Sequence, residues 1–262
     1  MIPLRDDNPT HGKVFVVPLF IAINVVVFFF VQPFSIGGGT SRDEVIEQLE
    51  FFACNAAIPY EVMHGEPVSK APGGALDATS PEEQATVLIQ RDACANKNVW
   101  LSILFSMFLH GGLLHLGGNM LFLWVFGNNI EDRLGPLAFV AFYLVAGVVA
   151  TFAQSALTPS AAIPLIGASG AVAGVLGAYL LLFPKARVTT LVIFFFITAI
   201  ELPAIVVLGI WFVLQLFSTV GPASTEAGGV AYMAHVAGFV AGMVLLLVFR
   251  PKRPRAPAVY LD

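Results

Sequence analysis

The chain has 262 residues, of which 57% are hydrophobic and only 11% are charged. Soluble domains carry about 25% charged residues, so this composition excludes a soluble globular protein and indicates one that crosses a membrane several times. The net charge is a small −4, and no basic stretch with interleaved aromatic residues points to nucleic acid as a partner.

The first apolar run covers residues 14–31 and is long enough to cross the hydrocarbon core of a bilayer. The residues before it mix acidic and basic side chains with prolines, and no small-residue cleavage site follows it closely. Those features are unlike a signal peptide, so we expect residues 14–31 to be an uncleaved first span.

A long first loop, residues 33–112, follows this span. It holds ten of the seventeen acidic residues and both cysteines, Cys54 and Cys94, which either form a disulfide or remain free thiols. Within the loop we expect a short amphipathic helix at 44–52. The apolar segment at 100–109 is too short to span, so we expect it to lie in the membrane interface.

Five further apolar stretches are separated by glycine, proline and charged residues, which are typical of turns and loops. We expect these stretches to be the second to sixth spans, at residues 113–130, 137–157, 167–183, 202–217 and 230–249, followed by a tail at 250–262. The predicted fold class is therefore an all-α polytopic membrane protein. Its six transmembrane helices form one domain that covers the whole chain.

One apolar stretch, residues 188–200, does not fit this pattern. It has about 13 residues, too few for a span, and Glu201-Leu202-Pro203 interrupts the run directly after it. We expect this stretch to be interfacial or re-entrant. We expect Glu201 to be an acidic residue at the start of a helix, where a negative charge is favourable.

The basic residues test the number of spans, because cytoplasmic loops of membrane proteins are enriched in Lys and Arg. Six spans place both termini on one face. Nine of the thirteen basic residues fall on that face, namely Arg5, Lys13, Arg133, Lys185, Arg187, Arg250, Lys252, Arg253 and Arg255. We therefore expect cytoplasmic termini and an extracytoplasmic first loop. The expected location is the inner (plasma) membrane of a bacterial cell, whose outer side permits disulfides.

Four polar side chains then lie in the extracytoplasmic half of the membrane: Ser169 in the fourth span, His235 in the sixth, and His115 and Asn119 in the second. The last two are four residues apart and share one helical face. Each residue alone is more often a packing residue, since a serine in a helix can bond the carbonyl four residues earlier. Polar side chains at this depth are costly and turn toward the protein interior, so the four can meet there.

A serine, two histidines and an asparagine at one depth are the side chains that acyl transfer to a serine requires. Serine is a weak nucleophile that needs a base, and a neutral His235 can take the proton of Ser169. The negative charge of a tetrahedral intermediate needs hydrogen-bond donors. Asn119, His115 and the backbone N–H of Ser169 can supply them, and we expect neither a metal nor a cofactor.

Small residues favour close packing of the fourth and sixth spans. Gly238 and Gly242 form a G-x-x-x-G pattern directly after the candidate base, and Gly170, Gly174 and Gly177 give the fourth span its own small face. Two such faces can pack with their backbones close together, which would carry the base toward the serine.

These residues resemble the rhomboid family of intramembrane serine proteases, over residues 100–250 and the first span. The matching patterns are Gly167-x-Ser169-Gly170, His110-x4-His115-x3-Asn119, Ala234-His235-x2-Gly238-x3-Gly242 and Glu131-x-Arg133-Leu134-Gly135. The resemblance implies a six-helix rhomboid-like bundle whose Ser–His dyad has no acidic third member. It also implies that water enters from the extracytoplasmic side, with residues 218–229 as a cap and the fifth span as a lateral gate.

The resemblance assigns a role to each candidate residue. Ser169 matches the nucleophile and His235 the general base. His115 and Asn119 match the residues that stabilise the oxyanion, and His110 matches a histidine that lines the hydrated cavity. The implied partners are the lipid bilayer and transmembrane protein substrates, which are cut within or beside their membrane helices.

The chain departs from the family at the position four residues after the serine. Some members carry an aromatic residue there that stacks on the catalytic histidine, whereas this chain has Ala173. Another group must therefore orient His235, and Tyr232 or packing around Gly238 are the candidates in the sequence.

Two other classes of function stay open at this point. A rhomboid-like pseudoprotease would bind membrane clients without cutting them, although such proteins lack the serine or the histidine that this chain keeps. A transporter is the other class, because broken segments such as residues 188–203 can mark transport sites, although the two halves show no inverted repeat. Neither the physiological substrate nor the oligomeric state follows from the sequence.

Overall fold

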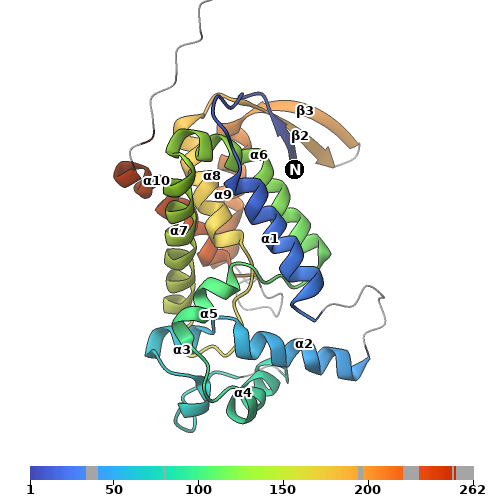
Figure 1. The fold of residues 1–262 in the computed structure, drawn as a ribbon, viewed down its shortest axis with the longest axis vertical. Coiled ribbons are helices and arrows are strands. Elements are labelled where there is room, and N and C mark those ends of the chain that lie inside the picture. The colour runs from blue at the N-terminus through green and yellow to red at the C-terminus, as the bar shows by residue number, and fades with distance from the viewer. Residues whose placement is uncertain (34–40, 79–80, 194–196, 221–229, 250, 252–262) are drawn as a thin grey trace, which may run out of the picture.

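The computed structural model describes residues 1–33, 41–78, 81–193, 197–220, 230–249 and 251. A bundle of long helices carries a small sheet at one end and a group of shorter helices at the other (Figure 1). Each of the six stretches predicted as spans is helical, with the bounds α1 (Val16–Phe30), α6 (Leu113–Leu134), α7 (Pro136–Leu157), α8 (Ser169–Leu182), α9 (Ala204–Val220) and α10 (Tyr232–Phe249). Residues 221–229 of the predicted cap and most of the predicted tail at 250–262 lie outside the described residues.

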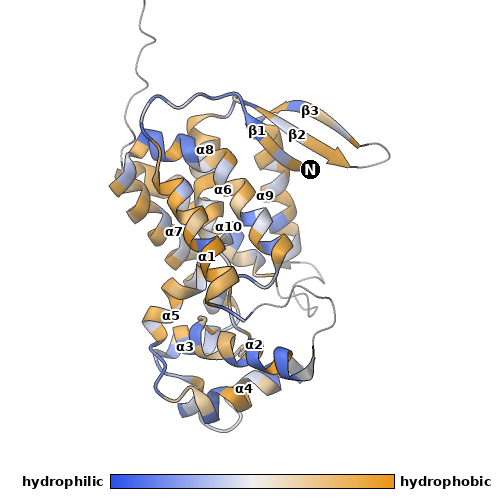
Figure 2. Cartoon of the chain, turned by 45° about the vertical axis from the view of Figure 1, so that its right-hand side comes forward, coloured by the Kyte–Doolittle hydropathy of each residue, from blue (hydrophilic) through white to orange (hydrophobic). Residues whose placement is uncertain are grey.

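The bundle helices are apolar around most of their circumference, while hydrophilic residues are more frequent in the shorter helices and in the connections at the ends (Figure 2). Among the described helices, α7 and α10 are each long and apolar enough to cross a membrane, and α1, α8 and α9 are apolar but shorter. Helix α8 has 14 residues and is about 21 Å long, less than the hydrocarbon core of about 30 Å.

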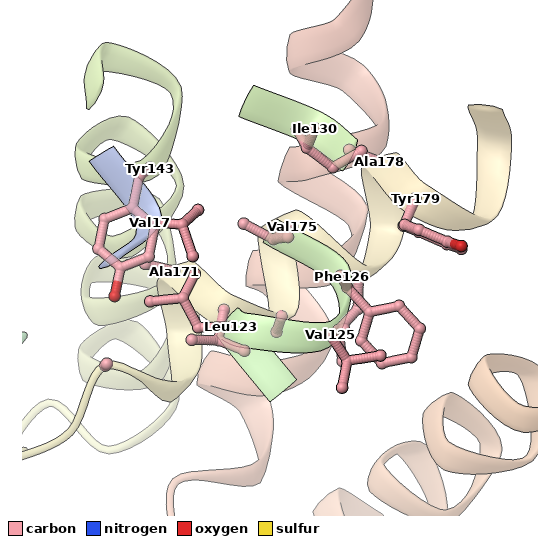
Figure 3. Packing of buried hydrophobic residues seen from close by; sticks show 14 of the residues in the cluster. Val17, Leu123, Val125, Phe126, Ile130, Tyr143, Ala171, Val175, Ala178 and Tyr179 are labelled. Carbon is pink, nitrogen blue, oxygen red and sulfur yellow. The ribbon is translucent and has the colours of Figure 1, made fainter. Parts of the chain in front are cut away.

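Helix α8 lies at the centre of the bundle and packs against α6, α7, α9 and α10. A β-carbon on Gly238 would overlap the carbonyl oxygen of Gly170, and one on Gly242 would overlap that of Gly174. The predicted close packing of small faces between these two spans is therefore confirmed. On another side of α8, the side chains of α1 and α6 fill the core (Figure 3).

The end of α6 holds the start of α1 through a buried carboxylate. Glu131 accepts hydrogen bonds from the backbone N–H groups of Phe15, Val16 and Val17 at 2.9, 2.9 and 2.8 Å. The first N–H groups of a helix have no partner within the helix, and a negative charge there is favourable. Glu131, the first residue of the Glu131-x-Arg133 pattern noted in the sequence, thus holds the start of α1.

Residues 188–193 and 197–200 lie in two antiparallel strands, β2 (Arg187–Ile193) and β3 (Ile197–Pro203), and β1 (Ile2–Asp6) pairs with β2 to complete the sheet. The segment forms strands because its β-branched residues favour a strand once another strand can pair with them. Its position in the membrane interface stays a prediction. Glu201 lies in β3, not at a helix start, and forms an exposed ion pair with Arg187 at 3.3 Å.

The first loop folds into helices stapled by a disulfide. They are α2 (Arg42–Asn55), α3 (Pro59–His64), the 3-10 turn η1 (Val68–Lys70), α4 (Pro81–Ala93) and α5 (Val99–Ser106). The amphipathic helix predicted at 44–52 lies within α2, and α5 covers most of the segment predicted to be interfacial. Cys54 and Cys94 are joined by a disulfide, so α2 is linked covalently to the chain that follows α4.

A buried ion pair also stabilises this loop domain, which comprises α2, α3, η1, α4 and α5. The Lys97 ammonium lies 2.6 Å from the Glu61 carboxylate, with side chains 2% and 0% exposed. Glu61 also accepts from the N–H of Val68 at 3.1 Å, and Lys97 donates to the carbonyl of Ala53 at 2.9 Å. Burial raises the pKa of Glu61 and lowers the pKa of Lys97, and the attraction between the two charges opposes both shifts.

Backbone hydrogen bonds tie the loop domain to the segment that leads into α8. The N–H of Leu165 donates to the carbonyl of Ala57 at 2.7 Å, and that of Asp77 donates to Ser160 at 2.9 Å. The N–H of Gly167 donates to the carbonyl of Ser106, at the end of α5, at 2.9 Å. The folded first loop therefore holds the residues directly before Ser169.

Candidate active site

Ser169 is the first residue of α8, and Gly167 shapes the turn before it. The φ angle of Gly167 is +122°, in a region that side chains other than glycine rarely adopt. A β-carbon at this position would lie 2.7 Å from Nε2 of His115 and 3.6 Å from Oγ of Ser169. The absence of a side chain at residue 167 therefore lets the His115 ring approach the serine.

The close packing of α8 and α10 sets the position of His235. A β-carbon on Gly170 would lie 3.8 Å from the carbonyl oxygen of Ala234. Gly170 and Ala234, which follow Ser169 and precede His235 in the chain, therefore lie side by side. Oγ of Ser169 has no hydrogen-bond partner among the described residues, which leaves it available to a substrate.

The four residues predicted to act together line one cavity of about 900 Å³. Its walls come from the turn before α6, from α6, from the start of α8 and from α10, and they include Ser169, His235, His115 and Asn119. Trp211 of α9 closes another side. The rest of the wall is largely glycine and apolar side chains, as is common for binding pockets.

Hydrogen bonds determine which groups His115 and Asn119 offer to this cavity. The N–H of Gly111 donates to Nδ1 of His115 at 3.4 Å, so the neutral ring carries its proton on Nε2, the atom nearest Gly167. Asn119 donates one amide proton to the backbone carbonyl of His115 at 3.1 Å. Its second amide proton has no protein partner among the described residues and can serve a ligand.

His110 lies behind the cavity wall and not in it. The side chain is fully buried, is absent from the described lining, and packs edge-on against the His115 ring with centroids 5.2 Å apart. Its backbone is held by Gln32, which accepts from the His110 N–H at 3.0 Å and donates to its carbonyl at 2.6 Å. The ring therefore contacts the cavity through His115, and the cavity-lining role that the resemblance implies for His110 stays a prediction.

Sequence reasoning missed a contact to His235. The side-chain oxygen of Gln215, on α9, lies 2.9 Å from Nδ1 of His235. The Trp211 ring is also close to the histidine, with centroids 5.9 Å apart. The signal that could have found Gln215 is its amide group within the otherwise apolar run of the fifth span.

A second, small cavity of about 30 Å³ lies behind the serine, lined in part by Ser106, Thr151, Gly167 and Ser169. A cavity of this volume can hold a water molecule, provided that polar partners are present. Ser106 and Thr151 supply hydroxyl groups here. Among the described residues, no group of three or more His, Cys, Asp and Glu side chains could hold a metal ion.

Comparison with known proteins decides the family. The model of the Rhomboid domain matches residues 97–252, which is more than half of the chain. The chain belongs to the rhomboid family. This family is polytopic and helical, in agreement with the six-helix bundle, and it includes serine intramembrane proteases that act on membrane proteins.

Three relatives illustrate the range of this rhomboid chain's similarities. It is 32% identical over 167 residues to "Rhomboid protein 1, mitochondrial" of Saccharomyces cerevisiae, covering 62% of this chain and 44% of the yeast protein. It is 38% identical over 95 residues to "Presenilin-associated rhomboid-like protein, mitochondrial" of Bos taurus, covering 36% and 25%. It is 28% identical over 170 residues to "Rhomboid protease GluP" of Bacillus subtilis, covering 65% and 25%. The matches thus span less than half of each relative.

These relatives correct the predicted location. The sequence led us to expect the inner membrane of a bacterial cell, with cytoplasmic termini. The yeast and bovine rhomboid proteins are both named as mitochondrial, which overturns that expectation. The distribution of Lys and Arg indicates which face of a membrane protein is which, but it does not identify the membrane in which the protein lies.

Proposed function

We propose that this chain is an intramembrane serine endopeptidase that cuts transmembrane proteins within or beside their membrane helices. Ser169 is the nucleophile and His235 the general base. The observation that carries the proposal is that both side chains line one cavity, with Gly170 and Ala234 packed against each other beside them. A serine becomes nucleophilic when a base comes within hydrogen-bond reach of its hydroxyl, and the shared cavity supports that arrangement.

The first half of the reaction forms an acyl-enzyme. Oγ of Ser169 attacks the scissile carbonyl carbon while the His235 ring takes the hydroxyl proton, and the carbonyl π electrons move onto its oxygen. When the tetrahedral intermediate collapses, the C–N bond breaks and the His235 proton passes to the leaving amine. An ester between the Ser169 oxygen and the substrate acyl group remains.

The second half is hydrolysis of that ester. A water molecule attacks the acyl carbon as His235 removes one of its protons, and collapse returns a proton to Oγ of Ser169 and releases the new carboxyl end. The small cavity lined by Ser106 and Thr151 is close enough to supply this water. Atoms and charges balance with the chain's own residues and one water.

Three donors at the cavity can stabilise the oxyanion. His115 offers Nε2–H, because its Nδ1 already accepts from Gly111, and Asn119 offers its second amide proton. The third donor is the backbone N–H of Ser169, which has no carbonyl to bind at the first position of α8. Donors placed in advance around a developing negative charge are the largest single contribution in many enzymes.

The transporter alternative loses its support. It rested on a broken segment within the bundle at residues 188–203, but β2 and β3 form a hairpin at the end of the bundle (Figure 1). The pseudoprotease alternative predicts binding of membrane clients without cleavage, so it is an outcome of the same experiment.

The test is cleavage of a transmembrane model substrate by purified protein in detergent, comparing the wild type with Ser169→Ala and His235→Ala. We expect cleavage by the wild type only. A fluorophosphonate probe adds a substrate-free measure and should label Ser169 in the wild type but not in Ser169→Ala. Cleavage that survives Ser169→Ala contradicts the proposal, and a wild type that binds substrate without cutting it favours the pseudoprotease.

A further inference from the structure

His235 is held by a polar side chain from a neighbouring helix. The Gln215 Oε1 atom on α9 lies 2.9 Å from Nδ1 of His235 on α10. This is the one protein hydrogen bond that the described residues offer to the ring. It answers a question raised by the sequence, which provides no aromatic residue at position 173 to support the base.

This hydrogen bond decides which ring nitrogen carries the proton. An amide oxygen can only accept, so Nδ1 must be the donor. In a neutral imidazole the other nitrogen, Nε2, then has a free lone pair. A general base needs that lone pair on the side of the nucleophile, so the contact with Gln215 prepares His235 for proton transfer.

The other neighbours of His235 among the described residues make no hydrogen bond to its ring. The Trp211 and Tyr232 rings have centroids 5.9 and 6.4 Å from that of His235, which restricts rotation of the ring. Neither contact distinguishes Nδ1 from Nε2. Ala173 is fully buried and brings only a methyl group. A hydrogen bond is therefore required to select one tautomer.

The packing of α9 determines where Gln215 lies. The start of this helix is anchored, since Ala204 and Leu208 are fully buried and the N–H of Ala204 donates to the carbonyl of Ala186 at 2.8 Å. Phe212 then stacks on Phe239 of α10 with centroids 4.6 Å apart. Leu208, Phe212 and Gln215 recur at helical spacing, so the face that packs on α10 also presents the amide to His235.

We propose that Gln215 is a positioning residue that holds His235 in the tautomer protonated on Nδ1. The inference rests on the proposed function, because it assigns His235 as the base. When His235 accepts the serine proton, the Nδ1–H donor becomes part of a cation, and its hydrogen bond to the amide oxygen strengthens. Gln215 thus stabilises the charged intermediate as well as the resting tautomer, without touching the substrate.

The experiment compares three variants on the same helix. Gln215→Leu removes the acceptor at similar size, and Gln215→Glu retains an acceptor oxygen at the same reach. Leu214→Ala is the matched control, since Leu214 is the adjacent residue and its side chain is 59% exposed. We expect Gln215→Leu to lower kcat about tenfold with little change in KM, Gln215→Glu to stay within about threefold of wild type, and Leu214→Ala to match wild type.

A spectroscopic measurement separates positioning from mere support of the fold. In protein labelled with ¹⁵N-histidine, the wild-type His235 ring should show a protonated Nδ1 and an unprotonated Nε2, with the signals assigned by their loss in His235→Ala. Gln215→Leu should shift this ring toward a mixture of tautomers. Should Gln215→Leu fail to fold, the wild-type spectrum and the kcat of Gln215→Glu still test the inference. A wild-type ring protonated on Nε2 overturns it.

The two proposals fail in different ways. If Ser169→Ala or His235→Ala still cleaves substrate, the proposed function is wrong whatever Gln215 does. If both are inactive but Gln215→Leu keeps the wild-type kcat and the wild-type tautomer, only the role of Gln215 is wrong.

Discussion

Gly238 lies so close to the carbonyl oxygen of Gly170 that no side chain fits between them. This contact joins α10 to α8 beside the two residues assigned to catalysis. Contacts of this kind are typical of membrane helices, where small residues let backbones approach closely. The relationship makes the geometry of the site depend on residues that take no part in its chemistry.

Replacing Gly238 by alanine should therefore separate the helices and lower both stability and activity. Overpacking costs about 1–3 kcal/mol, and a small displacement of His235 would reduce cleavage further. Gly209 on α9 is the matched control, because a β-carbon there meets no atom within 4 Å. The midpoint temperature of thermal unfolding in detergent should fall for Gly238→Ala only. An equal fall for Gly209→Ala would contradict the inference that Gly238 is needed for close helix packing.

Asn119→Ala tests the oxyanion donors. Loss of a full oxyanion donor costs about 2.7–4 kcal/mol, and we expect a smaller loss in kcat because His115 and the N–H of Ser169 remain. Asn128 on the same helix makes the same kind of bond to a carbonyl four residues earlier, at 2.9 Å, but lies outside the described cavity lining. Asn128→Ala should leave kcat unchanged, and an unaltered kcat in Asn119→Ala would remove Asn119 from the mechanism.

The buried pair of Glu61 and Lys97 should matter more to stability than the exposed pair of Arg187 and Glu201. Lys97→Met leaves a buried carboxylate without its partner, which costs about 3–5 kcal/mol. Arg187→Met breaks a pair whose side chains are 68% and 52% exposed, worth less than about 1 kcal/mol. Thermal unfolding of the two variants measures the difference, and similar losses would show that burial of the first pair is unimportant.

The same pair predicts a dependence of stability on pH. Burial raises the pKa of Glu61, so the folded protein holds this proton more tightly than the unfolded chain. The stability that protonated Glu61 contributes to the folded state is fully present below the ordinary carboxyl pKa. It is lost as pH rises through the raised pKa of the folded protein. Glu61→Gln should remove that slope from the free energy of unfolding measured against pH, and a slope of the opposite sign in the wild type would refute the assignment.

Reduction of the disulfide should loosen the first loop and, through it, the active site. Cys54 and Cys94 are 40 residues apart, and closing a loop of that length stabilises by about 4 kcal/mol in the chain-entropy model. The loop domain bonds to the segment before Ser169, so cleavage should also fall. Thiol labelling should find two reactive cysteines only after reductant, and Cys54→Ser/Cys94→Ser should reproduce the loss of activity without reductant.

Much of the architecture could be read from the chain alone. A bilayer requires about 20 apolar residues per span, and all backbone polar groups must be satisfied within the helix, so each span is recognisable locally. The cost of polar side chains at membrane depth likewise singled out Ser169, His235, His115 and Asn119 within their apolar runs. Each of these inferences depends on residues near one another in sequence.

The sequence was least informative where distant segments decide the structure. Residues 188–193 and 197–200 lie in paired strands, to which β1 from the start of the chain adds a third, and no local pattern reports that partner. The sequence likewise did not show that the His110 ring is fully buried against the His115 ring.

Hydropathy and glycine spacing act within one helix, so the apolar helices, their small faces and the reactive side chains could be found in the chain alone. How His235 is held depends on the packing of two helices. The bond from Gln215 to His235 joins two helices at an angle and depth set by packing, so neither residue reveals the other in the sequence.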